Sequence, residues 1–231
     1  MISIKKLSKQ YNEKVVLNIP ELHFAQGECV GLVGNNGAGK TTLFSLMLDL
    51  IRPTSGEVAI AGVRVDENEE WKRLTSSFID ESFLIGYLTP EEYFYFIGEL
   101  RGANKATVDA FLGEYVEFFN GEILNSRKYL RDFSKGNQKK VGLVASLIGD
   151  PELIIWDEPF ANLDPSTQIR LKNMVNRLRA VGNKTILISS HDLSHTVDVT
   201  DRIVVLEKGV VVKDIQSSPD SLRELESFFQ V

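Results

Sequence analysis

The sequence is poor in side chains that form disulfides or bind transition metals. Of its 231 residues one is cysteine and three are histidine, so no internal disulfide can form and no zinc-binding Cys/His cluster is present. Cys29, the single cysteine, lies in an apolar run, and we predict that it is a small core residue.

Excess positive charge and long apolar runs are also missing. With 26 basic and 32 acidic residues the net charge is −6, which disfavours a general nucleic-acid binder, because such proteins need a basic surface. No run approaches the ~20 apolar residues that cross a bilayer, and the opening MISIKKLSKQY has no signal-peptide pattern. We therefore expect a cytoplasmic chain that reaches a membrane only through a partner.

The rest of the composition is that of an ordinary globular protein, with 43% hydrophobic and 25% charged residues. Short apolar and β-branched runs alternate with helical patterns, which predicts an α/β fold around a central sheet. We expect buried strands at residues 29–33, 153–156 and 185–188, a helix at 41–51, and strand–turn–strand units at 57–65 and 203–212.

Residues 89–148 differ from the rest of the chain, because helical periods dominate there and no strand is evident. We interpret them as a helical lobe inserted into a core of residues 1–88 and 149–231, within one domain. The lobe is rich in aromatic side chains, which can line a partner groove or pack between helices, and packing is favoured: Tyr93, Phe94, Tyr95, Phe96, Phe118 and Phe119.

A glycine-rich loop follows the strand expected at residues 29–33. It reads GNNGAGKT and matches the pattern G-x-x-x-x-G-K-[ST] between a strand and a helix, which is typical of a loop that binds nucleotide phosphates. Glycines let backbone N–H groups approach phosphate oxygens, and the helix N-terminus adds partial positive charge. The predicted contacts are Gly34, Asn35, Asn36, Gly37, Ala38, Gly39, Lys40, Thr41 and Thr42, with Lys40 on the β/γ-phosphates and the Thr41 hydroxyl on Mg²⁺.

A second apolar strand, at residues 153–156, ends in two carboxylates. In enzymes with such a phosphate loop, an aspartate at this place holds the magnesium that bridges the terminal phosphates. An adjacent glutamate can orient and polarise the attacking water. We predict that Asp157 is a magnesium partner and that Glu158 is the general base.

Four further motifs narrow the class. Residues 133–138 read FSKGNQ and resemble the signature L-S-G-G-Q of ABC ATPases, and residues 162–165 (NLDP) resemble that family's D-loop. His191, after the strand expected at 185–188, resembles the switch histidine, and Tyr11 resembles the aromatic residue that stacks on adenine. In order and spacing, nearly the whole chain resembles the ATP-binding subunits of ABC transporters, especially those of small exporter systems.

The resemblance implies a P-loop NTPase (RecA-like) core with an antiparallel β subdomain and an inserted helical signature subdomain. It implies ATP hydrolysis with Mg²⁺ and two subunits docked head to tail, in which Ser134 and the Gly136 N–H contact the γ-phosphate of ATP on the partner. It also implies a separate transmembrane permease at the inner face of the membrane. Because one chain carries every motif, a homodimer is favoured over a heterodimer.

The histidines are weighed separately. His191 directly follows a core strand, where open α/β sheets place ligand-binding groups, so a contact with the γ-phosphate is favoured. His23 is interpreted as a surface or packing residue, and His195 as incidental.

The sequence departs from the family pattern at two places. The signature has Lys135 and Asn137 at its third and fifth positions, and we expect activity to survive because the serine and the second glycine are kept. The glutamine expected after the strand near residues 74–78 is absent; by register Asp80 takes its place, with Glu81 as the alternative. We predict that Asp80 is a ligand on the magnesium side of the site, since oxygen ligands suit that ion.

Two alternative functions stay open at this point. One is an ABC ATPase that works with soluble partners, and the other is a scaffold that binds ATP without hydrolysing it. The presence of both Glu158 and His191 disfavours the scaffold. The motifs specify no cargo, and export is only favoured over import.

Overall fold

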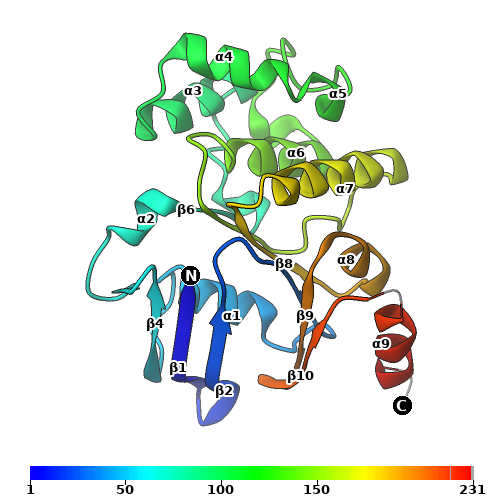
Figure 1. The fold of residues 1–231 in the computed structure, drawn as a ribbon. Helices are drawn as coiled ribbons and strands as arrows, with labels where there is room; N and C mark the ends of the chain where they lie inside the picture. The colour runs from blue at the N-terminus through cyan, green and yellow to red at the C-terminus, as the bar shows by residue number, and fades with distance from the viewer. Residues whose placement is uncertain (219, 230–231) are drawn as a thin grey trace.

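A computed structural model describes residues 1–218 and 220–229. The chain forms two sheets, one of four strands in the order β2-β1-β4-β5 and one of six in the order β10-β9-β3-β8-β7-β6 (Figure 1). The helices α3, α4 and α5 lie at the far end of the molecule from the four-stranded sheet. The α/β class expected from the sequence is confirmed.

The six-stranded sheet is the centre of the fold. Its neighbours β9-β3-β8-β7-β6 are parallel, whereas β10 pairs antiparallel with β9. Continuous apolar runs such as CVGLV and LIIW are buried on both faces, as parallel strands require. The strands are β3 (Cys29–Val33), β6 (Thr75–Phe78), β7 (Leu153–Trp156), β8 (Thr185–Ser190), β9 (Arg202–Glu207) and β10 (Val210–Gln216).

Alternate residues of this sheet face two different cores. On β7, Leu153 and Ile155 join a cluster with α1 and the four-stranded sheet, whereas Ile154 and Trp156 join a cluster with the helical lobe. The antiparallel sheet comprises β1 (Ile2–Tyr11), β2 (Lys14–Phe24), β4 (Ser55–Ile60) and β5 (Val63–Arg64). The carboxyl end of β7 is therefore fixed by packing on both faces of the sheet.

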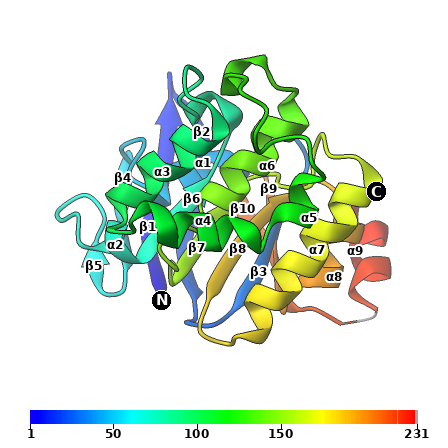
Figure 2. The ribbon, with the colours of Figure 1, turned by 90° about the horizontal axis from the view of Figure 1, so that it is seen from above.

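The helices surround the large sheet, and α7, α8 and α9 follow one another along one side of the molecule (Figure 2). Their bounds are α1 (Lys40–Met47), α2 (Trp71–Leu74), α3 (Pro90–Leu100), α4 (Lys105–Gly113), α5 (Val116–Phe119), α6 (Lys135–Ala145), α7 (Pro165–Ala180), α8 (Leu193–Val199) and α9 (Ser221–Phe229), with 3₁₀ turns at Glu81–Phe83 and Leu130–Asp132. No helix among the described residues is long and apolar enough to cross a membrane.

The strand predictions hold with small differences. The strands at residues 29–33 and 153–156 are confirmed, β8 runs two residues beyond the expected end, and both strand–turn–strand units are present. The helix expected at 41–51 was too long, because α1 ends at Met47. Leu48 caps it, and Asp49 takes a left-handed conformation (φ 52°) that stops the helix before the proline does.

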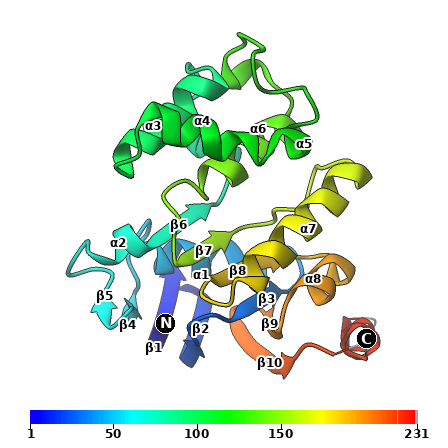
Figure 3. The same ribbon diagram turned by 45° about the horizontal axis from the view of Figure 1, so that its top comes forward.

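Residues 89–148 contain helices, one 3₁₀ turn and no strand (Figure 3). Tyr93, Phe94, Phe118 and Phe119 are buried, and the rings of Phe94 and Phe119 lie 5.7 Å apart, so helix packing explains most of the aromatic cluster. Phe96 is an exception and is exposed. The buried aromatics therefore pack the lobe onto the face of the sheet that carries Ile154 and Trp156, in one shared core.

Candidate nucleotide site

The loop between β3 and α1 has the shape expected of a phosphate loop. Gly37 (φ 82°) and Gly39 (φ 107°) are left-handed, a conformation that side chains disfavour. A Cβ on Gly34 would lie 2.2 Å from the carbonyl oxygen of Leu206, so no larger residue fits there. The loop lines a pocket of about 270 Å³, together with Val16 and Glu158.

Lys40 places a buried positive charge inside this loop. The residue is 6% exposed, and its ammonium donates to the Gly34 carbonyl oxygen over 2.7 Å. The same nitrogen lies 3.2 Å from Oε1 of Glu158. The charge is therefore held where phosphate oxygens would meet the loop.

Thr41, which lines the pocket, pairs with the buried carboxylate of Asp157. The Thr41 hydroxyl donates to Asp157 Oδ2 over 2.5 Å, and the Ser189 hydroxyl donates to the other oxygen. Burial raises the pKa of Asp157, and these two hydrogen bonds act in the opposite direction. One hydroxyl and one carboxylate suit Mg²⁺, which keeps several waters and binds phosphates directly. The described residues hold no cluster of three or more His, Cys, Asp or Glu that would suit another metal.

The Glu158 carboxylate lies between Lys40 and His191. The backbone of Glu158 is left-handed (φ 46°), and its N–H donates to the Ser189 hydroxyl over 2.9 Å. One carboxylate oxygen faces Lys40 and the other lies 2.8 Å from Nδ1 of His191. A strained non-glycine conformation costs of order 1–3 kcal/mol and typically persists at functional sites. The structure thus brings Lys40, Glu158 and His191 together.

The signature residues lie elsewhere on the surface. Ser134 is the N-cap of α6, where its hydroxyl accepts from the Asn137 N–H over 3.2 Å, and it is exposed. A Cβ on Gly136 would meet the Asn162 carbonyl oxygen at 2.9 Å, so the helix start packs closely on the turn after β7. Neither residue lines the pocket of the phosphate loop.

Two other predicted residues are also outside that pocket. Tyr11 ends β1, is 47% exposed, and has the Lys9 ammonium 4.7 Å from its ring centre. The Asp80 carboxylate accepts from the Ser82 N–H over 2.8 Å and caps a 3₁₀ turn. Hydrogen bonds from Ser82 lower the pKa of Asp80. The roles of Tyr11 and Asp80 stay predictions.

Sequence reasoning missed Ser189 and Lys139. Ser189 lies one residue beyond the strand expected at 185–188. Its hydroxyl could have been predicted to reach the site, because the carboxyl ends of parallel strands are where ligand-binding groups lie. Lys139 is 5% exposed and donates to the carbonyls of Glu158 and Ala161, which no local pattern indicates. The other two histidines lie outside the pocket. His23 is exposed, and the ring of His195 stacks on Phe160 with the ring centres 5.2 Å apart.

A phosphate loop after β3 of a mainly parallel sheet, with a carboxylate pair at the end of β7 in the same sheet, defines a P-loop ATPase. The ABC transporter family matches residues 17–161. The chain is 35% identical to the bacitracin transport ATP-binding protein BcrA of Enterococcus faecalis over 94% of its own length and 70% of that protein's. This chain spans between 59% and 76% of the length of other curated relatives that it matches.

Two solved structures agree with this match. The ATP-binding subunit of an ABC transporter has a TM-score of 0.84 and 30% identity, covering 98% of this chain and 93% of that one. A dimeric bacterial ABC transporter cassette has a TM-score of 0.83 and 25% identity, covering 94% and 99%. The chain belongs to the ABC transporter family, as an ATP-binding subunit with ATPase activity.

Proposed function

We propose that this chain hydrolyses ATP at two composite sites of a head-to-tail dimer and thereby drives a membrane transporter. The observation that carries the proposal is the division of the expected phosphate-binding groups between two surfaces. Lys40 and Glu158 line one pocket and His191 contacts Glu158, whereas Ser134 is exposed outside that pocket. A second copy of the chain can supply the missing surface.

Each residue then has a defined task. Backbone N–H groups of residues 34–42 and the Lys40 ammonium bind the phosphates, while Thr41 and Asp157 hold magnesium, which neutralises charge on the terminal phosphates. Glu158 accepts a proton from the attacking water. His191 orients Glu158 through their contact and reaches the γ-phosphate. Tyr11 stacks on adenine, and Asp80 contacts the metal or its water.

The closing surface comes from the partner copy. Its Ser134 hydroxyl and Gly136 N–H, at the start of α6, form an anion site of the kind that helix N-termini provide. Because this chain carries both surfaces, a homodimer has two equivalent sites. Residues 89–148 act as the lobe that presents the signature, and residues 1–88 and 149–231 act as the core.

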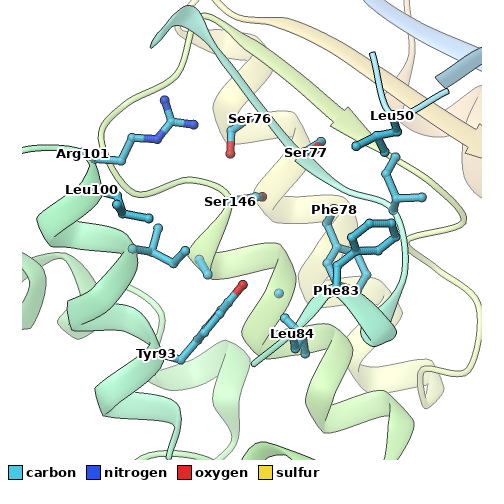
Figure 4. Close-up of a pocket in the computed structure, with 14 residues that line it drawn as sticks. Leu50, Ser76, Ser77, Phe78, Phe83, Leu84, Tyr93, Leu100, Arg101 and Ser146 are labelled. Atoms are coloured by element: carbon cyan, nitrogen blue, oxygen red, sulfur yellow. The ribbon is translucent and has the colours of Figure 1, made fainter. Parts of the chain in front are cut away.

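A separate membrane permease is the partner that we propose. A pocket of about 260 Å³ lies at the junction between the sheet edge and the lobe, lined by apolar side chains around Ser76, Ser77 and Arg101 (Figure 4). Leu50, Phe83 and Leu100 on its lining are 48%, 61% and 68% exposed. Contact with the permease there places the chain at the inner face of the membrane, and export is the direction we propose.

Three measurements test the function. Purified protein should release phosphate from ATP in a magnesium-dependent manner, and absence of release would favour a scaffold. Tagged protein should co-purify with a polytopic membrane protein, whereas capture of a soluble partner alone would favour a soluble ABC ATPase. Uptake or efflux in vesicles with the captured permease decides the direction.

A further inference from the structure

A buried ion pair connects the two lobes behind the nucleotide site. Lys139 lies on α6, five residues after Ser134, and Glu81 begins the 3₁₀ turn after β6. Their charged atoms lie 3.6 Å apart, with side-chain exposures of 6% and 9%. A buried charge is costly without partners, so both groups need each other in this place.

The Lys139 ammonium also reaches the turn that carries Glu158. It donates to the carbonyl oxygen of Glu158 over 2.8 Å and to that of Ala161 over 3.0 Å. An ammonium has three donors, and Glu81 faces the third. Burial lowers the pKa of Lys139, while the carboxylates of Glu81, Glu158 and Asp157 act in the opposite direction.

We infer that Lys139 is a positioning residue for Glu158 and that Glu81 fixes Lys139 in that task. The strained Glu158 backbone needs an external tie, and Lys139 holds the carbonyl of that same residue. This inference rests on the proposed role of Glu158 as the base. It assigns a function to Glu81 that differs from the metal contact proposed for Asp80.

The physical reason is the precision that proton transfer requires. A general base must lie within hydrogen-bond reach of the water, and small displacements of reacting groups cost a large part of the rate. Lys139 does not line the phosphate-loop pocket. Its loss should therefore lower kcat and leave nucleotide affinity unchanged.

The test compares two neighbouring buried lysines. Lys139→Met should lower kcat about tenfold with KM for ATP within about twofold of the wild type. Lys140→Met is the matched control, because Lys140 is similarly buried on the same helix but its ammonium pairs with Glu122 instead of the carbonyls of Glu158 and Ala161. Lys140→Met should keep kcat within about twofold. Lys139→Arg, which retains the charge and the donors, should recover most of the lost rate.

Each outcome is decisive. Wild-type kcat in Lys139→Met overturns the inference, and so does an equal loss in both lysine variants, which would indicate a general effect on α6. If Lys139→Met does not fold, Glu81→Gln decides, since it keeps the side-chain volume: a lowered kcat with unchanged KM supports the tie, and unchanged kcat overturns it. A wild-type protein without phosphate release would instead refute the proposed function, and the inference with it.

Discussion

The phosphate loop and the start of α6 are two surfaces of one chain that differ in how far their polar groups are already engaged. At the loop, Lys40 is buried against Glu158 and the Gly34 carbonyl, and Asp157 accepts two hydroxyl hydrogen bonds. At α6, the Ser134 hydroxyl accepts from the Asn137 N–H and from no other donor in the described part of the chain, and the residue is exposed.

This difference has a consequence for binding and catalysis. When the charged groups of a pocket are already in place, the free-energy cost of reorganising them around bound phosphates is small. The phosphate loop can therefore bind nucleotide in a single chain. An exposed helix start gains a strong partner only when another molecule brings an anion to it. Substitutions in the phosphate loop should therefore change nucleotide binding and the chemical step. Substitutions at the start of α6 should change the rate of ATP hydrolysis by the dimer and leave nucleotide binding to the single chain unchanged.

The largest expected effect comes from Glu158→Gln. The amide keeps the side-chain shape but cannot accept the proton, so we expect kcat to fall about a thousandfold. ATP binding should persist, and an ATP-bound dimer should accumulate on size-exclusion chromatography. Glu207→Gln, on the partly exposed β9 end, is the control. Loss of ATP binding in Glu158→Gln would mean that the base has been misassigned.

Lys40→Ala should act on binding itself. Loss of a buried ammonium from the loop removes charge-assisted contacts with phosphate, and we expect Kd for ATP to rise about a hundredfold, or about 2.7 kcal/mol. Calorimetric titration measures this change, with Lys172→Ala at a surface ion pair as the control. An unchanged Kd would remove Lys40 from the phosphate contacts.

Ser134→Ala tests the other surface. We expect kcat to fall about tenfold, because one donor to the partner's phosphate is lost while the Gly136 N–H remains. ATP affinity of the single chain should not change. Asn104→Ala is a matched control, since Asn104 caps α4 through the same kind of contact, with the Thr107 N–H. Both variants lose a cap worth about 1 kcal/mol of stability, so equal kcat in the two would contradict the trans-phosphate role.

The same contrast explains how much could be predicted from the sequence. The strand ends, the loop and the two carboxylates were accessible because their pattern is local and matches parallel-strand packing at residues 29–33 and 153–156. The ion pair between Glu81 and Lys139 was not, because the two residues lie 58 positions apart in the chain (139 − 81) and only the packing of α6 on the sheet edge joins them. The end of α1 was missed because one left-handed residue, Asp49, decided it.

The smallest expected effect falls between the two surfaces, at Asp80, which follows β6 where the chain leaves the sheet for the helical lobe. Its carboxylate is tied to Ser82 and its pKa is lowered, so it stays ionised at neutral pH. If it also serves magnesium, Asp80→Ala should raise the Mg²⁺ concentration for half-maximal hydrolysis about fivefold, less than the 10-fold to 100-fold typical of firmly held outer ligands because the residue is exposed.

Asp80→Asn separates this metal role from the cap. The asparagine oxygen still accepts from the Ser82 N–H, but the negative charge is gone. A metal role requires the Mg²⁺ dependence to shift in both variants, whereas a cap alone predicts a wild-type Mg²⁺ curve for Asp80→Asn and only a lowered melting temperature for Asp80→Ala. In that second case the turn after β6 would affect catalysis through the ion pair of Glu81 with Lys139. The neighbouring carboxylate of Asp80 would then serve only to cap the turn.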